Sequence, residues 1–226
     1  MASLTWLGHA SFEIELNGSV IYTDPWFNVK PRENERLVMP SVKSVDSIRK
    51  AEVILVSHEH FDHCDAYDTT RIAQRTFATV VGPEEALAKL HDISPRVKMV
   101  VNEGDSFVLH GLNIRVTPAR HPQSVNPVGF VVEKGGKSVY FAGDTYEFHD
   151  MSNINVDVAL IPIGGTYTMD ILGAVGAVKR MQAKFAVPMH FNTFSQIKAD
   201  PHEFAQRLRG GKTEVKVLEI GQTLNF

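Results

Sequence analysis

The segment SHEHFDH, residues 57–63, follows directly on the apolar run EVILVS. A continuous apolar run of this length is typical of a strand buried on both faces. Side chains two residues apart in extended backbone point the same way, so His58 and His60 are predicted to face one point. Asp62 and His63 follow where the chain bends toward a helix, so they can face a neighbouring point. Imidazole and carboxylate groups together suit zinc, iron or manganese.

The alternative interpretation of this segment is a solvated polar loop, which is the better reading for a lone histidine. Three histidines and one aspartate within six residues are a different case. Placed at the mouth of an apolar strand, they would repel one another at low pH unless something binds them. The segment therefore favours a metal site over a solvated loop.

The rest of the chain divides into two similar halves. The first begins with a hairpin of SFEIEL and SVIYTD joined by Asn17-Gly18, and the second contains VGFVVEK and KSVYFAG joined by Gly135-Gly136. Each half continues through a buried strand to a histidine, at His58 and at His190. Helices are predicted near residues 44–50, 65–75, 83–90, 168–183 and 201–209, and a surface loop over 27–40. This pattern predicts two sheet layers covered by helices on the outside. No linker segment separates the halves, so we expect one domain over residues 1–226.

Composition limits the function classes. The 226 residues are 43% hydrophobic and 22% charged, with a net charge of -3, so nothing indicates a general attraction to nucleic acid. No membrane-spanning run and no signal pattern occur, so we expect a cytoplasmic protein that acts on a small molecule; a homo-oligomer stays open. Cys64 is the single cysteine, which excludes an intramolecular disulfide and a thiolate-rich metal cage. Any metal must therefore use nitrogen and oxygen ligands.

The pattern from His58 to His63 is the His-x-His-x-Asp-His loop, and through it the chain resembles the metallo-β-lactamase superfamily. Four more segments occur in the order that this superfamily shows: Asp24 in IYTDP, His121 in ARHPQ, Asp144 in FAGDT and His190 in PMHFN. The stretches WLGHASF, TDP, PIGG and TYTMD are similar to the small predicted metal-dependent hydrolases of this superfamily. That subgroup is related to ascorbate-phosphate lactonases and N-acyl phosphatidylethanolamine phospholipase D.

The resemblance implies an α/β (α+β) fold, a four-layer αβ/βα sandwich of two mixed sheets covered by helices, with the site at the open edge of both sheets. It also implies two divalent metal ions, zinc first, with manganese or iron as alternatives. By this analogy the first ion is held by His58, His60 and His121, the second by Asp62, His63 and His190, and Asp144 bridges both. Asp24 would support the histidine loop from behind, with a structural Asp-Pro turn as an equal alternative.

The function implied is metal-dependent hydrolysis, in which a metal-bridging hydroxide attacks an ester, lactone or phosphodiester. Asp62 would orient the nucleophile or accept its proton. Two alternatives stay open. One is an iron-dependent oxidoreductase on the same scaffold, and the other is a non-catalytic metal-bound module.

Two further residues are candidates for the substrate pocket. His9 lies in a Gly-His turn that faces the pocket in the resembled subgroup, although a turn histidine is otherwise usually solvated. Asn192 closely follows the predicted ligand His190. Trp26, Thr166 and Tyr167 are weaker candidates, because they only flank such segments.

Overall fold

The computed structural model describes residues 2–27 and 43–226, which form two mixed seven-stranded sheets. The first sheet contains β1 (Ala2–Gly8), β2 (Ser11–Leu16), β3 (Ser19–Thr23), β4 (Val53–Leu55), β5 (Thr79–Gly82), β6 (Lys98–Val100) and β14 (Thr223–Asn225). The second contains β7 (Ser106–Leu109), β8 (Leu112–Pro118), β9 (Val128–Lys134), β10 (Lys137–Phe141), β11 (Asn155–Pro162), β12 (Gln182–Met189) and β13 (Glu214–Val215). The helices are α1 (Ala66–Thr76), α2 (Glu84–Leu87), α3 (Ile171–Arg180) and α4 (Pro201–Leu208).

The two sheets have the same topology. Their orders are β14-β1-β2-β3-β4-β5-β6 and β7-β8-β9-β10-β11-β12-β13. In each order the first three pairings are antiparallel and the last three are parallel. The turn after β1 therefore corresponds to the connection after β8, and the segment after β3 to the segment after β10. Carboxyl ends of parallel strands meet at one sheet edge, which is where α/β proteins usually place their sites.

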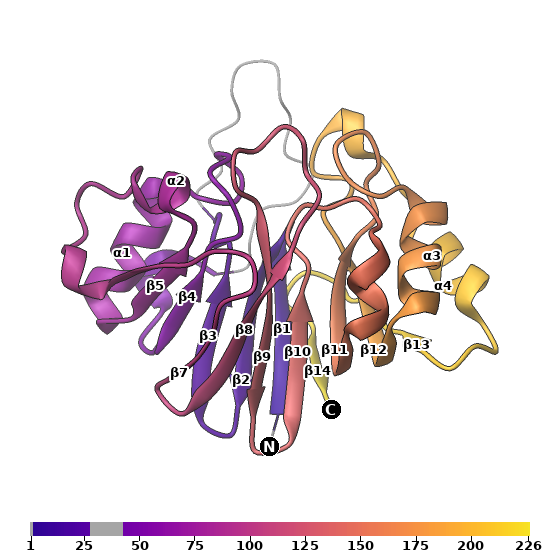
Figure 1. Cartoon of the computed structure of the whole chain (residues 1–226), viewed down its shortest axis with the longest axis horizontal. Coiled ribbons are helices and arrows are strands. Elements are labelled where there is room, and N and C mark those ends of the chain that lie inside the picture. Colours follow the sequence, from indigo (N-terminus) through magenta and orange to yellow (C-terminus); the bar gives the residue numbers. More distant parts are fainter. Residues whose placement is uncertain (1, 28–42) are drawn as a thin grey trace.

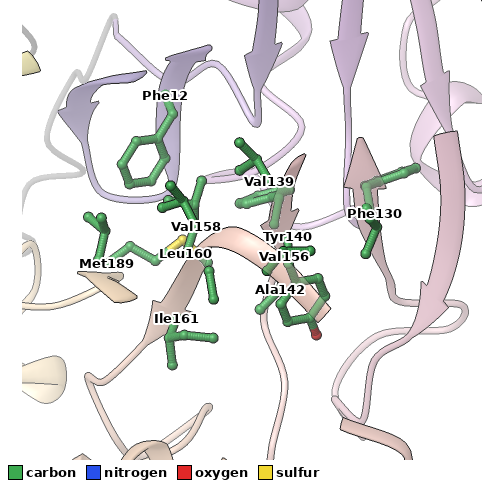
Figure 2. Packing of buried hydrophobic residues seen from close by; sticks show 14 of the residues in the cluster. Phe12, Phe130, Val139, Tyr140, Ala142, Val156, Val158, Leu160, Ile161 and Met189 are labelled. Atoms are coloured by element: carbon green, nitrogen blue, oxygen red, sulfur yellow. The ribbon is translucent and has the colours of Figure 1, made fainter. Parts of the chain in front are cut away.

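The main core lies between the two sheets, and helices cover their outer faces (Figure 1). In β4, Val53 and Leu55 belong to the inner core, while Ile54 packs with α1 on the outer side. This alternation is the two-residue period of a strand covered on both faces. Figure 2 shows residues of both sheets meeting in the inner core, among them Phe12 of β2 and Leu160 of β11. The expected four-layer sandwich is confirmed.

Both predicted hairpin turns are present. Asn17 and Gly18 have φ of 45° and 83°, and Gly135 and Gly136 have φ of 60° and 75°. Two successive residues with positive φ are what a type I′ turn requires, and this turn suits the twist of the flanking strands. The turns fix the register of β2 with β3 and of β9 with β10.

Several predicted elements are shorter than expected. The helix predicted over 44–50 is a single 3-10 turn, Val45–Ser47, and the helix predicted over 83–90 reduces to α2. Helix α3 begins only at Ile171, because the Asp170 side chain accepts from Gly173 N and caps it there. Leu172, in the first turn of α3, is 60% exposed although it is large and apolar. The predicted loop over 27–40 lies, except for Phe27, outside the described residues. Among the described residues no helix is long and apolar enough to span a membrane.

Candidate metal centre

Three histidine rings meet where β4 and β8 end. His58 and His60 follow β4, and His121 lies in the connection between β8 and β9. Nδ1 of His60 lies 3.0 Å from Nε2 of His58 and 3.2 Å from Nε2 of His121. Two different sheets therefore bring these side chains to one point. We call His58, His60 and His121 the histidine trio.

Two members of the trio are oriented by backbone carbonyls. His60 donates from Nε2 to the carbonyl oxygen of Gln123 at 3.1 Å, and His121 donates from Nδ1 to the carbonyl oxygen of Tyr167 at 3.1 Å. A carbonyl oxygen only accepts, so each of these nitrogens carries the proton of the neutral ring. Nδ1 of His60 and Nε2 of His121 are then left as bare lone pairs that face each other.

The third member, His58, is oriented through Ser57. Ser57 Oγ donates to Oδ2 of Asp24 at 2.5 Å, so a lone pair of this hydroxyl accepts from Nδ1 of His58 at 2.9 Å. Burial and the nearby charge of His63 lower the pKa of His58 well below its usual value, which keeps the ring neutral and its Nε2 bare. Nδ1 of His60 thus lies 3.0 Å and 3.2 Å from two other bare nitrogens, and such lone pairs repel one another unless a cation lies among them.

Four further side chains adjoin the trio, and we call them the mixed cluster: Asp62, His63, Asp144 and His190. Asp144 follows β10 and His190 follows β12. Nε2 of His63 lies 3.4 Å from Oδ1 of Asp144, and Nε2 of His190 lies 3.1 Å from Oδ2 of Asp144. Oδ2 of Asp62 lies 3.9 Å from Nε2 of His63. The centroids of the His58 and His63 rings are only 4.2 Å apart, so the cluster and the trio form one site.

Asp24 lies behind this site and is fully buried. Its Oδ1 accepts from Ser57 N at 2.7 Å, and its Oδ2 accepts from Nδ1 of His63 at 2.6 Å. The latter bond puts a proton on Nδ1 of His63 and turns Nε2 toward Asp144. Hydrogen bonds of this kind are the ones by which a carboxylate orients a histidine, and a simple Asp-Pro turn would not make one.

The mixed cluster concentrates charge in a buried place. Burial disfavours the ionised forms of the histidines and of the carboxylates, but the attraction between their opposite charges outweighs this cost. The carboxylates of Asp144 and Asp62 raise the pKa of His63 well above its usual value, and His190 and His63 lower the pKa of Asp144 well below its own. When Nε2 of His63 carries a proton, its charge neutralises the carboxylates of Asp144 and Asp62. A metal ion bound in the same place would do the same.

These residues fit a metal centre. Nε2 of His63, Oδ1 of Asp144 and both ring nitrogens of His190 are buried and have no hydrogen-bond partner among the described residues. A buried polar atom without a partner costs about 1–3 kcal/mol, so several in one place require an explanation. Imidazole nitrogens and carboxylate oxygens are donors that bind zinc, manganese or iron, and coordination would satisfy every one of these atoms except Nδ1 of His190.

His9 lies beneath this site rather than in a solvated turn. It is 4% exposed and has a φ of 51°. Its Nε2 lies 3.2 Å from Oδ2 of Asp62, and its Nδ1 lies 2.9 Å from Oγ1 of Thr193. Burial and the neighbouring His190 lower the pKa of His9 to about 4. The structure places His9 beside the site, where its side chain contacts Asp62 and is absent from the described residues that line the cavity below.

Asn192 is placed differently from the prediction. Its amide donates to the carbonyl oxygen of Ala199 at 3.0 Å and accepts from Ala199 N at 3.1 Å. Both ends of the side chain therefore close the loop that follows β12. Asn192 is also absent from the described residues that line the cavity. This geometry assigns it to loop closure rather than to substrate contact.

A cavity of about 280 Å³ opens onto the site. Five of the predicted metal ligands line it, together with residues that the sequence analysis largely missed: Phe61, Gln123, Tyr167, Phe194, Gln196 and Ile197. Phe61 is 41% exposed although it is large and apolar. Its position between His60 and Asp62 in the ligand loop was the available signal, because an apolar side chain in such a loop is placed beside the site. Of the weaker candidates only Tyr167 lines the cavity, while the Trp26 ring packs against those of Phe61 and Phe194.

The comparisons with known proteins agree with this architecture. The family model of the beta-lactamase superfamily domain matches residues 3–190. A UPF0173 metal-dependent hydrolase of Thermoplasma volcanium is 40% identical, over 99% of this chain and 98% of the relative. A UPF0173 metal-dependent hydrolase of Caldivirga maquilingensis is 37% identical, over 100% of this chain and 99% of the relative.

A solved structure extends the comparison to three dimensions. Igni18, a metallo hydrolase from Ignicoccus hospitalis, superposes with a TM-score of 0.83 at 35% identity, over 100% of this chain and 99% of Igni18. The chain therefore belongs to the beta-lactamase superfamily, in the group whose members are named UPF0173 metal-dependent hydrolases. The superfamily inferred from the His-x-His-x-Asp-His loop is confirmed.

Proposed function

We propose that this chain is a hydrolase that uses two divalent metal ions, zinc in preference to manganese or iron, to cleave an ester, lactone or phosphodiester of a small substrate. One observation carries the proposal. Three bare imidazole nitrogens converge beside a second group of buried donor atoms that lack hydrogen-bond partners among the described residues. The names of the relatives, metal-dependent hydrolases, support the same activity.

The chemistry follows from the placement of the side chains. We assign the first ion to the histidine trio and the second to Asp62, His63 and His190, with Asp144 between them. Two ions held there would lower the pKa of a shared water from about 15.7 toward about 7 and polarise the substrate oxygen. Asp62 lines the cavity, where its carboxylate can orient that water.

The electrostatics of Asp62 suit a metal ligand and an acceptor of a hydrogen bond that orients the water, more than a group that accepts its proton. Burial on its own raises the pKa of a carboxyl group, but the charge of His63 and the hydrogen bond from His9 bring the pKa of Asp62 well below its usual value. The side chain is therefore ionised at neutral pH. A cysteine nucleophile is not needed, because burial raises the pKa of Cys64 to about 12 and leaves it as a thiol.

The cavity indicates a small substrate with an apolar part. Its volume of about 280 Å³ lies at the lower end of the roughly 300–1,000 Å³ of small-molecule sites. Phe61, Phe194 and Ile197 form an apolar side, and the remaining described walls beyond the metal cluster are two amides and a phenol. No lysine or arginine belongs to the described lining. Aryl and short alkyl esters and lactones therefore fit the described walls best.

The first experiment is reconstitution of chelator-treated protein with zinc, manganese or iron, followed by metal analysis and assay on esters, lactones and phosphodiesters. We expect about two ions per chain and turnover of at least one substrate class. His190→Ala should lose one ion and the activity. His202→Ala is the matched control, because His202 is an exposed histidine on α4 away from the site. Protein that holds two ions yet leaves every substrate intact would contradict the proposal.

The same preparations separate the alternatives. Iron in protein purified from its native host, together with oxygen consumption, would support an oxidoreductase, whereas zinc or manganese would disfavour it. If Asp62→Ala alters folding or ligand binding while neither form turns over substrate, the metal-bound module is the better description.

The aromatic side of the cavity has its own test. Phe61→Ala is expected to raise KM for an aryl ester about two- to tenfold with little change in kcat, since losing an aromatic contact costs about 0.5–1.5 kcal/mol. Metal content is measured in parallel, because Phe61 lies between two proposed ligands. An unchanged KM with full metal content would place the substrate elsewhere.

A further inference from the structure

Among the described residues, His9 is the one buried histidine beside the site that is not part of the trio or the mixed cluster. It lies in the turn between β1 and β2, and two hydrogen bonds to its carbonyl oxygen fix the backbone there. Trp6 Nε1 donates to this oxygen at 3.1 Å, and the backbone N of His190 donates to it at 3.1 Å. The turn of the first sheet is thereby tied to the end of β12 in the second sheet.

The side chain of His9 also connects the two sheets. Nε2 lies 3.2 Å from Oδ2 of Asp62 in the histidine loop, and Nδ1 lies 2.9 Å from Oγ1 of Thr193 in the loop after β12. Thr193 is 4% exposed, so this pair is as buried as His9 itself. The other contact of the hydroxyl, to the carbonyl oxygen of Phe191, is 3.5 Å long and too weak to compete.

These partners distinguish His9 from His121, which lies in the corresponding connection after β8 of the second sheet. Nε2 of His121 faces a bare nitrogen of His60, and that pair needs a cation between its members. Nε2 of His9 faces a carboxylate oxygen, which accepts a proton, so the pair is satisfied by one hydrogen bond. The proton then lies on Nε2, and Nδ1 can accept from the hydroxyl of Thr193.

We propose that His9 is a positioning residue for Asp62: it donates to Oδ2 and holds the carboxylate in the orientation that the second metal ion and the nucleophile require, while the hydroxyl of Thr193 donates to Nδ1 of His9 and holds its ring in place. The inference rests on the proposed function for the assignment of Asp62 to the second metal ion, and not for any substrate. Groups that orient a metal ligand typically change metal affinity or activity by roughly 10–100-fold when they are lost.

The test compares two variants of His9 in the full-length protein. His9→Gln keeps an N–H donor that can reach Asp62, and His9→Leu keeps the approximate volume without any donor. We expect His9→Leu to weaken zinc binding at one of two sites by about 10–100-fold, as measured by competition with a chelator. His9→Gln should restore affinity to within a few-fold of the natural protein. Equal zinc affinity in both variants and the natural protein would overturn the proposal.

A second pair keeps the proposal testable if His9→Leu does not fold. Thr193→Val removes the hydroxyl and preserves the shape of the side chain, and Thr193→Ser preserves the hydroxyl. We expect weaker zinc binding for Thr193→Val and near-natural binding for Thr193→Ser. The reverse order, or no difference between the two, would show that the hydroxyl does not act through His9.

Cobalt substitution separates positioning from direct coordination. Visible absorption of bound Co²⁺ depends on the number and type of its ligands, so a positioning role predicts the same spectrum for the natural protein and His9→Gln at saturating cobalt. A changed spectrum for His9→Gln would show that His9 is itself a ligand and would overturn the proposal. Both metal readouts remain valid if no substrate is found, so failure of the proposed function does not decide this inference.

Discussion

The two halves of the molecule share one topology but contribute unequally to the site. The segments after β3 and β10 correspond, and each supplies a buried aspartate, Asp24 and Asp144. Both carboxylate oxygens of Asp24 accept hydrogen bonds, Oδ1 from Ser57 N and Oδ2 from Ser57 Oγ and from Nδ1 of His63. Asp144 instead has an oxygen without a hydrogen-bond partner among the described residues. Corresponding segments therefore carry a supporting carboxylate in one half and a proposed metal ligand in the other.

The same contrast holds for the histidines. The first half concentrates four proposed ligands in the short loop after β4. The corresponding loop after β11 supplies no proposed ligand, but its Tyr167 carbonyl orients His121. The second half contributes single residues at the ends of different strands. A half on its own thus lacks part of both groups of donors, which explains why the site lies at the edge where the sheets meet.

The largest effect should come from the aspartate of the second half. Asp144→Asn removes the charge shared by His63 and His190, and we expect kcat/KM to fall about 1,000-fold or more, since metal ions contribute several kcal/mol to transition-state stabilisation. Metal content should fall in parallel. Nearly natural activity with full metal content would contradict the assignment of Asp144 as the bridging ligand.

Metal removal should destabilise the protein as a whole, because both halves contribute donors. At a free zinc concentration 100 times the Kd, bound metal adds about 2.7 kcal/mol to the free energy of unfolding. We therefore expect a chelator to lower the thermal unfolding midpoint. His121→Ala should remove only the part of this shift that is due to one ion. An identical midpoint with and without zinc would argue against a site that links the sheets.

The aspartate of the first half should have a smaller effect than its counterpart. Asp24→Asn keeps the shape but removes the carboxylate that accepts from His63 and Ser57. Zinc affinity is expected to fall about 10–100-fold, while the number of ions bound at saturating zinc stays at two. An effect as large as that of Asp144→Asn would mean that the two positions are equivalent in function as well as in topology.

The sequence predicted the part of the site whose residues lie close together in the chain. The structure brings the rings of His58 and His60 together, as predicted, but β4 ends at Leu55 and both residues lie in the loop after it, so the two-residue period of a strand is not the cause. The positions of Asp144 and His190 came from the resemblance to a known superfamily, because nothing local indicates that segments 46 residues apart meet at one point. The double hairpin pattern predicted the two-half architecture, since turn residues with positive φ have few alternatives.

What the sequence could not predict depends on tertiary contacts. A histidine in a turn is usually solvated, but contacts with Trp26, His190, Thr193 and Phe194 bury His9. Asn192 is next to a ligand segment, but the position of Ala199 decides that its amide closes a loop. Phe194 reaches the cavity by the same loop. Sequence neighbours of a ligand are therefore poor guides to the substrate pocket.

The smallest effect concerns Glu59, which connects the two halves outside the metal ligands. Its carboxylate accepts from Ser124 Oγ at 2.7 Å and from Val125 N at 3.1 Å, and so ties the histidine loop to the connection that carries His121. Burial on its own would raise the pKa of Glu59, but these two hydrogen bonds lower it below its usual value.

Glu59→Gln leaves the amide nitrogen opposite one of those donors and should weaken the connection by about 0.5–1.5 kcal/mol. We expect zinc affinity at the histidine trio to fall about two- to twelvefold, because the loop that positions His121 gains freedom. Ser124→Ala removes only one of the two bonds and should give a smaller loss. If Ser124→Ala were the more damaging change, Glu59 would not be the group that holds the halves in register at the first ion.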